Sequence, residues 1–261
     1  MHPTSSAELR AHLLASRLCG EVATTAGNSL GNAGRLLAGE AAYTFGLPDW
    51  KDATLDDVLD AVEAAGGRLR GRDQPDGPSG IDPDAALAAI ARQHELVAPL
   101  LGGGGGQVLV ATGHPFALVA HYGAVARALM AAGCRVLRPL EGERHRLRAA
   151  DGGRCSLRYV DGVACLYQHA GLQHTHLPDY MEAMLAEVGG ATAVDLVVAD
   201  HGFAGAAMAA GVPTVAIADI NDPALPLAAH RGRPGVVLVI DDGLEPVLFA
   251  PVTEALLGGL S

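Results

Sequence analysis

The sequence predicts an α/β protein with a Rossmann-like, mostly parallel sheet and helices on both faces, preceded by a helical N-terminal region. Two observations support this. After residue 106, short apolar runs rich in β-branched residues alternate with alanine-rich segments of helical pattern. The runs are apolar throughout, which is typical of strands buried on both faces of a parallel sheet. Before residue 102, the apolar residues recur mainly with a helical period.

The N-terminal region, residues 1–101, is predicted to be mainly helical. Ser6 and Thr54 stand where N-cap residues are expected, and acidic residues follow Thr54 in the first helical turn. Pro83 suits the first turn of a later helix. The expected helices cover residues 6–18, 33–45, 54–65 and 82–101, and the expected loops cover residues 24–32 and 68–81.

The glycines of residues 102–106 are expected to link this region to a Rossmann-like domain over residues 107–261. Residues 144–160 alternate in a different way and are expected to form a hairpin insertion. The strands are expected at residues 107–112, 135–139, 163–168, 195–199, 214–218 and 236–240, and the helices at 117–132, 178–188, 203–210 and 246–258.

Composition excludes several functions. The chain carries 18 basic and 29 acidic residues, a formal net charge of −11, which argues against a nucleic-acid partner. The single lysine, Lys51, follows no glycine-rich loop and lies in a polar stretch, which excludes a Walker P-loop and a PLP Schiff base. No G-x-G-x-x-G follows a predicted strand, so neither a nicotinamide nor a flavin cofactor is expected.

The sequence carries no targeting signal that we can identify. Its four cysteines form no C-x-x-C pair and are expected to be reduced thiols. The first residues lack the features of a signal peptide. Residues 96–126 hold no formal charge, but glycines and histidines interrupt them, so we expect no membrane span. We expect a cytoplasmic protein with no membrane partner, and the sequence leaves a homo-oligomer open.

Polar residues cluster directly after the predicted strands. In open α/β sheets, ligands bind outside the carboxyl ends of the strands. Asp241 and Asp242 follow the last strand and are interpreted as an ordinary turn. The residues that we expect to share a site follow the first, third, fourth and fifth strands; they are Thr112, Gly113, His114, His174, His176, Asp200, His201, Asp219 and Asp222.

This mixture of imidazoles and carboxylates predicts a divalent metal, with Zn, Mn, Fe or Co favoured over Mg because of the histidines. His201 is the predicted general acid and base, and Asp200 is assigned to catalysis beside it. The predicted metal ligands are His174, His176, Asp200, Asp219 and Asp222.

A phosphate group is expected on the turn Thr112, Gly113 and His114, which opens onto a helix N-terminus. Asn28 and Arg35, from the N-terminal region, are expected to close over the site and bind phosphate. Covalent mechanisms lack a candidate, because the sequence contains no C-x5-R loop, no D-x-D-x-T strand end and no G-x-S-x-G elbow. Water activated by a metal remains as the nucleophile.

Several sequence blocks resemble a family of bacterial, largely actinobacterial, phosphatases. The resemblance spans nearly the whole chain and implies hydrolysis of a phosphate ester. The more specific blocks are Thr112-Gly113-His114-Pro115, His174-Thr175-His176, Ala199-Asp200-His201-Gly202 and Asn221-Asp222-Pro223-Ala224.

We therefore predict a metal-dependent phosphatase that hydrolyses a phosphomonoester of a small metabolite, either a nucleotide or a sugar phosphate. Two alternatives stay open. The first is another metal-dependent hydrolase or a cyclase that acts on an anionic metabolite. The second is a non-catalytic module that binds a phosphorylated ligand, although binding alone rarely needs so many imidazoles.

Overall fold

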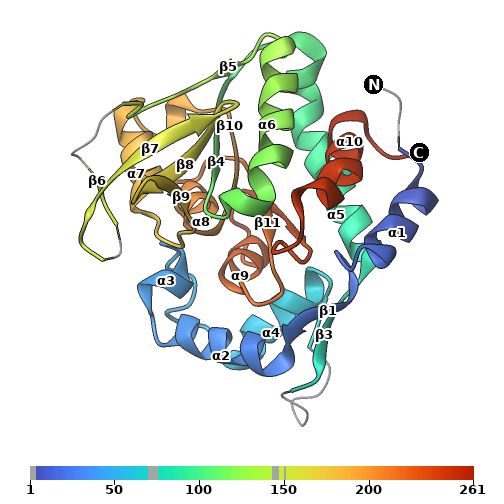
Figure 1. The fold of residues 1–261 in the computed structure, drawn as a ribbon. Coiled ribbons are helices and arrows are strands. Elements are labelled where there is room, and N and C mark those ends of the chain that lie inside the picture. Colours follow the sequence, from blue (N-terminus) through green and yellow to red (C-terminus); the bar gives the residue numbers. More distant parts are fainter. Residues whose placement is uncertain (1–3, 70–75, 143–146, 150) are drawn as a thin grey trace.

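The centre of the molecule is a mixed, mostly parallel sheet (Figure 1). The computed structural model describes residues 4–69, 76–142, 147–149 and 151–261. The sheet has the order β12-β11-β10-β4-β8-β7-β6, and four of its pairings, from β12 across to β8, are parallel. This confirms the predicted fold class. The parallel strands are β4 (Gln107–Thr112), β8 (Val163–Gln168), β10 (Leu196–Asp200), β11 (Thr214–Ala218) and β12 (Gly235–Val239).

The far side of the sheet is antiparallel. β7 (Arg154–Val160) pairs with β8 and with β6 (Leu147–Arg148), which confirms a hairpin within the segment predicted to be an insertion. β9 (Gly171–Gln173) also pairs with β8. β5 (Arg135–Val136) is shorter than the strand predicted over residues 135–139, because the chain enters a turn at Pro139.

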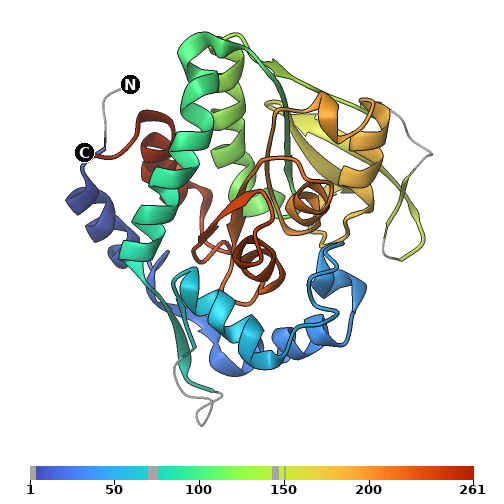
Figure 2. The same cartoon turned by 180° about the vertical axis from the view of Figure 1, so that it is seen from behind.

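Helices cover both faces of the sheet (Figures 1 and 2). On one face α5, α6 and α10 pack together, and on the other α7, α8 and α9 pack together. The bounds of these helices are α5 (Pro83–Pro99), α6 (Pro115–Ala131), α7 (Asp179–Glu187), α8 (His201–Ala209), α9 (Ala224–His230) and α10 (Ala250–Gly258), and the short turns are η1 (Leu100–Gly104), η2 (Ala191–Ala193) and η3 (Pro246–Phe249).

The N-terminal region differs in two places from the prediction. The loop expected over residues 24–32 is the end of a strand and the start of α2, and the loop expected over 68–81 contains strand residues of a small antiparallel sheet in the order β1-β3-β2. The elements are α1 (Ser6–Ala15), β1 (Gly20–Thr25), α2 (Ala26–Leu37), α3 (Ala41–Thr44), α4 (Leu55–Ala64), β2 (Gly67–Arg68) and β3 (Pro78–Ile81). Residues 70–75 of the second loop lie outside the described residues. The division of the chain at residues 102–106 stays a prediction.

The helix predicted over residues 33–45 covers only the second part of α2, and residues 26–32 were expected to be a loop because the buried face of α2 is made of small residues. Ala26, Ser29, Ala33 and Leu36 are buried at helical spacing, but only the last has a large side chain. The Thr25 side chain caps the helix by accepting from the backbone N–H of Asn28.

Helix α4 begins as predicted, with a reciprocal capping box between Thr54 and Asp57. Helix α9 was not predicted at all, because Pro223 and Pro226 resemble helix breakers. Pro226 lies in the first turn of α9, where backbone N–H groups have no partner within the helix, so its ring is tolerated there.

One close backbone contact joins the N-terminal region to the core. Phe45 follows α3 with a left-handed φ of 52°, and its carbonyl lies over Gly205 of α8. A Cβ at Gly205 would lie 2.1 Å from the Phe45 carbonyl oxygen. No helix in the described part of the chain is long and apolar enough to cross a membrane.

We expect Gly205→Ala to destabilise the protein by about 1–3 kcal/mol, because backbone and not a flexible side chain obstructs the new methyl group. Gly34→Ala is the matched control, since Gly34 is also helical and a Cβ there meets nothing within 4 Å. The control should gain about 0.5–1 kcal/mol from the better helix former. Urea unfolding measures both changes, and equal effects would show that the Phe45 contact is not a constraint.

Candidate active site

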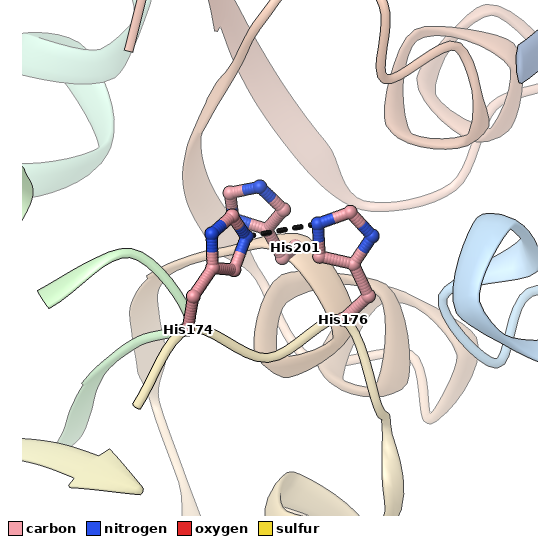
Figure 3. Close-up of side chains that lie close together, drawn as sticks. All are labelled: His174, His176 and His201. Atoms are coloured by element: carbon pink, nitrogen blue, oxygen red, sulfur yellow. Dashed lines mark hydrogen bonds between the residues drawn. The ribbon is translucent and has the colours of Figure 1, made fainter. Parts of the chain in front are cut away.

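Four imidazoles gather at the carboxyl edge of the parallel strands. His114 follows β4, His174 and His176 follow β9, and His201 is the first residue of α8 after β10. The Nε2 atoms of His174 and His176 are 2.9 Å apart, and both rings point toward His201 (Figure 3). The rings of His114 and His174 stack with centroids 4.7 Å apart, as do those of His176 and His201.

Two glycines allow the segment that carries His174 and His176 to lie directly on the strand ends. A Cβ at Gly113 would be 2.3 Å from the Thr175 carbonyl oxygen, and one at Gly202 would be 2.3 Å from the His176 carbonyl oxygen. The Thr175 N–H donates to the Gly113 carbonyl at 2.9 Å, which ties this segment to the turn after β4. Any larger residue at these two positions would displace the histidines.

The Asp200 carboxylate is completely buried and organises the surrounding groups. It accepts hydrogen bonds from the Thr112 hydroxyl at 2.6 Å, the Gly113 N–H at 2.6 Å and the Nδ1 of His201 at 2.8 Å. A carboxylate beside Nδ1 requires a proton on that atom, so Nε2 is the His201 nitrogen that could bind a ligand once its own proton is lost. His201 also has a left-handed φ of 46°, which an imidazole residue rarely adopts in the first position of a helix.

Two further carboxylates face the His201 ring. Its Nε2 lies 3.3 Å from Asp222 and 3.8 Å from Asp242. Burial disfavours the charged imidazole, but Asp222, Asp200 and Asp242 outweigh it and raise the pKa of His201 to about 10. Burial raises the pKa of Asp222 to about 6, although the His201 charge opposes the shift.

His174 and His176 behave in the opposite way. Burial, reinforced by the neighbouring His201 charge, lowers the pKa of His174 to about 3 and that of His176 to about 4. Both rings are therefore neutral near pH 7 and present lone pairs. The His176 Nδ1 lies 2.9 Å from the Ala42 carbonyl, which places the proton on Nδ1 and leaves Nε2 available.

The donor set suits a transition metal. Two overlapping groups have ligand atoms within 4.8 Å of one another: His174, His176 and His201, and His114, His201 and Asp242. Two buried atoms at this point, His114 Nδ1 and Asp242 Oδ2, have no hydrogen-bond partner among the described residues, which is unusual for buried polar atoms in a folded protein. Imidazole nitrogens with carboxylate oxygens are the ligands that Zn, Mn, Fe and Co accept.

Asp219 lies in the same acidic surroundings but makes different contacts. Its carboxylate accepts from the Thr24 hydroxyl at 2.9 Å and from the Ile220 N–H at 2.7 Å, and it belongs to neither group of ligand atoms. Burial, with the charges of Asp242 and Asp222, raises its pKa well above the ordinary value. Its assignment as a metal ligand stays a prediction.

The turn predicted to hold phosphate is occupied by the protein's own hydrogen bonds. The Thr112 hydroxyl and the Gly113 N–H both donate to Asp200, and the His114 N–H donates to Thr112 at 2.9 Å. The first two donors hold the Asp200 carboxylate in place, and the third holds the Thr112 hydroxyl oxygen. The assignment of this turn to phosphate stays a prediction. The His114 side chain, in contrast, is only half-buried and faces the other imidazoles.

The structure places Arg35 and Asn28, the two N-terminal residues that were expected to bind phosphate, in different surroundings. Arg35 donates to the Tyr43 hydroxyl and lies 5.0 Å from the centre of its ring, and the Tyr43 ring is 6.3 Å from that of His176. Arg35 thus reaches the edge of the site through Tyr43. Asn28 is exposed, and among the described residues its side chain forms no hydrogen bond.

Asp242 is the residue that sequence reasoning set aside. It reads as part of a turn, Asp241-Asp242-Gly243, yet it is buried between His114 and His201. The neighbouring imidazoles keep its pKa below the ordinary value in spite of its burial. The available signal was its place after β12, at the same edge as the other polar residues.

The fold and site together define an α/β protein with a buried histidine and aspartate centre at the carboxyl ends of its parallel strands. A family model described as Phosphatase matches residues 4–260. A Streptomyces coelicolor A3(2) protein named Phosphatase SCO2771 is 38% identical over 266 residues, which cover 97% of this chain and 95% of the relative. No solved structure gives a significant match. This chain belongs to the phosphatase family, which confirms the resemblance seen in the sequence.

We expect Thr112→Val to destabilise the protein by about 1–3 kcal/mol, because it leaves an oxygen of the buried Asp200 carboxylate without its donor. Thr112→Ser keeps the hydroxyl and should recover most of that loss. The free energy of unfolding, measured in chelator so that metal content does not differ, checks both variants. Equal stability of the valine variant and the wild type would contradict the central position given to Asp200.

Proposed function

We propose that this protein is a metal-dependent phosphatase that hydrolyses a phosphomonoester of a small metabolite. The observation that carries the proposal is the convergence of His174, His176 and His201 beside buried carboxylates, in a chain of the phosphatase family. Two of these rings are neutral, and the third is oriented by Asp200. This arrangement matches a transition-metal site whose ligands are held by a second layer of hydrogen bonds.

His174, His176 and His201 would hold the metal through their Nε2 atoms, and Asp222 would supply a carboxylate from the adjacent loop. A divalent metal there supplies a Lewis acid that polarises a phosphoryl oxygen and lowers the pKa of water. In the metal-free protein His201 carries a proton, so metal binding has to displace it.

The sequence assigned proton transfer to His201, but the geometry favours His114 for this role. His201 is buried with its Nδ1 bound to Asp200, whereas His114 is half-buried and stacks on the exposed His174. The Asp242 carboxylate, 3.4 Å from Nδ1, raises the pKa of His114. A protonated His114 would then donate to the leaving oxygen of the ester.

We expect His174→Ala and His176→Ala each to lose bound metal and to lower kcat/KM for phosphate release by at least about 1,000-fold, because each removes a neutral ligand. Elemental analysis after dialysis, together with a phosphate-release screen over nucleotides, sugar phosphates and simple esters, measures both effects. His169→Ala is the control, since this ring is 73% exposed and faces Asp151 instead of the cluster.

The proposal fails if the wild-type protein binds no divalent ion and releases no phosphate from any ester, with or without added Zn, Mn, Fe or Co. Release of a product other than phosphate would point to the alternative hydrolase or cyclase. Ligand binding that survives chelation and leaves the ligand intact would point to a binding module.

A further inference from the structure

An apolar groove runs between α6 and α10, the green and red helices that lie side by side in Figure 1. It has a volume of about 410 Å³. Its walls carry small and aliphatic side chains, with one imidazole among them. The residues that matter here are Ala120, His121, Ala124, Val247, Ala250 and Leu257.

Two large apolar side chains, one in the groove wall and one on the preceding turn of α6, are exposed to solvent. Val247 is 71% exposed, and Phe116 is 69% exposed. Phe116, Ala120 and Ala124 are spaced four residues apart on α6, so they share one face of the helix and extend the apolar surface toward its N-terminus. A large apolar patch that is exposed to solvent often marks a binding site.

His121 gives the groove one specific polar feature. It is only 3% exposed, and its Nδ1 lies 2.7 Å from the Thr253 hydroxyl, which itself donates to the Phe249 carbonyl. Because that hydroxyl proton is already used, the His121 Nδ1 must donate, and Nε2 is left as an acceptor. No hydrogen bond to Nε2 is found among the described residues, so an O–H or N–H group of a ligand in the groove could donate to it.

One helix of each groove wall begins close in sequence to a residue of the active site. Helix α6 begins at Pro115, directly after His114, and η3 begins at Pro246, shortly after Asp242. These two site residues face each other at 3.4 Å. His121 follows His114 by seven residues, which is about 10 Å along a helix axis. The exposed carboxylate of Glu254 lines the same groove and would repel a phosphate group there.

We propose that this groove binds the organic group of the phosphate ester, and that this group is apolar, alkyl or aromatic, with one hydrogen-bond donor that meets His121. The inference rests on the proposed function, since it places the phosphate at the histidine cluster and the leaving group along α6. A polar sugar would leave most of its hydroxyl groups unpaired against alanine, valine and leucine, so sugar phosphates are disfavoured.

The test compares methyl, butyl and hexyl esters, whose leaving groups have similar intrinsic reactivity. With the metal-loaded protein, we expect KM to fall about threefold for each added methylene group that enters the groove. Titration calorimetry with methyl-, butyl- and hexylphosphonate, which cannot be hydrolysed, should show the same trend in Kd. This second measurement reports binding independently of turnover.

Val247→Asp places a charge on the groove wall at a position exposed enough to leave folding intact, and it should abolish the dependence of Kd on chain length. Leu55→Asp is the matched control, since Leu55 is 39% exposed on α4, outside the groove lining. The control should keep the threefold trend for each methylene group.

His121→Phe separates the polar feature from the apolar one. The wild-type protein should bind 6-hydroxyhexylphosphonate about as tightly as hexylphosphonate, because Nε2 accepts from the hydroxyl group. The variant should keep its affinity for hexylphosphonate and lose about tenfold for the hydroxylated ligand, whose hydroxyl group is then buried without a partner. Equal discrimination by the wild type and the variant would overturn the role given to His121.

Phosphate release or phosphonate binding that does not depend on chain length would overturn the groove assignment and leave the phosphatase proposal standing. Absence of both release and binding would overturn the two together. A wild-type dimer that Val247→Asp converts to monomers, without any effect of chain length, would assign the groove to a second copy of the chain and so overturn the proposal.

Discussion

The carboxylate of Asp200 lies where water cannot reach it, and three donors from two parts of the chain meet on it. The Thr112 hydroxyl and the Gly113 N–H come from the turn after β4, and His201 comes from the start of α8. Burying a carboxylate without such donors would cost much free energy. The three donors are therefore fixed in position together with Asp200. The Thr175 N–H then bonds to the Gly113 carbonyl, so the loop with His174 and His176 is fixed to the same point.

The net charge of −11 is concentrated in part at this edge of the sheet. Five buried aspartates stand at the strand ends, and no Arg or Lys within the described ranges forms an ion pair with any of them. His201 and His114 provide some compensation, since neighbouring carboxylates raise the pKa of both rings. Under the proposed function, a bound cation would offset part of this negative charge and would allow an acidic site to accept an anionic ester. The five are Asp200, Asp219, Asp222, Asp241 and Asp242.

Two kinds of local pattern could be predicted from the sequence: strands that are buried on both faces of the sheet, and the cap at the start of a helix. The apolar runs of β4, β10, β11 and β12 and the capping box of α4 were found, because each has a local physical cause. The first part of helix α2 was missed because its buried face is built from small residues, and α9 was missed because a proline in a first turn resembles a breaker. Both depend on packing partners that are distant in sequence.

For the site, too, one part could be predicted from the sequence and another part could not. Strand-end positions could be predicted because parallel topology brings them to one edge, and the structure does bring His114, His174, His176 and His201 together there. What each side chain does at that edge could not be predicted. Asp242 reads as a turn residue until its burial between two imidazoles is known, and the hydrogen bonds of Thr112 and Gly113 depend on which way Asp200 points. Orientation is set by tertiary contacts that one sequence does not encode locally.

The two glycines beneath the His174–His176 segment have a consequence for binding energy. Backbone lies on backbone there, with no side chain between, and the Thr175 N–H bond to the Gly113 carbonyl holds the segment against the strand ends. The histidines are therefore preorganised, and the entropy of ordering them is lost during folding and not at the moment a ligand binds. A site of this kind gains affinity from rigidity alone, and it also rejects ligands of the wrong size, since the imidazoles cannot spread to admit them.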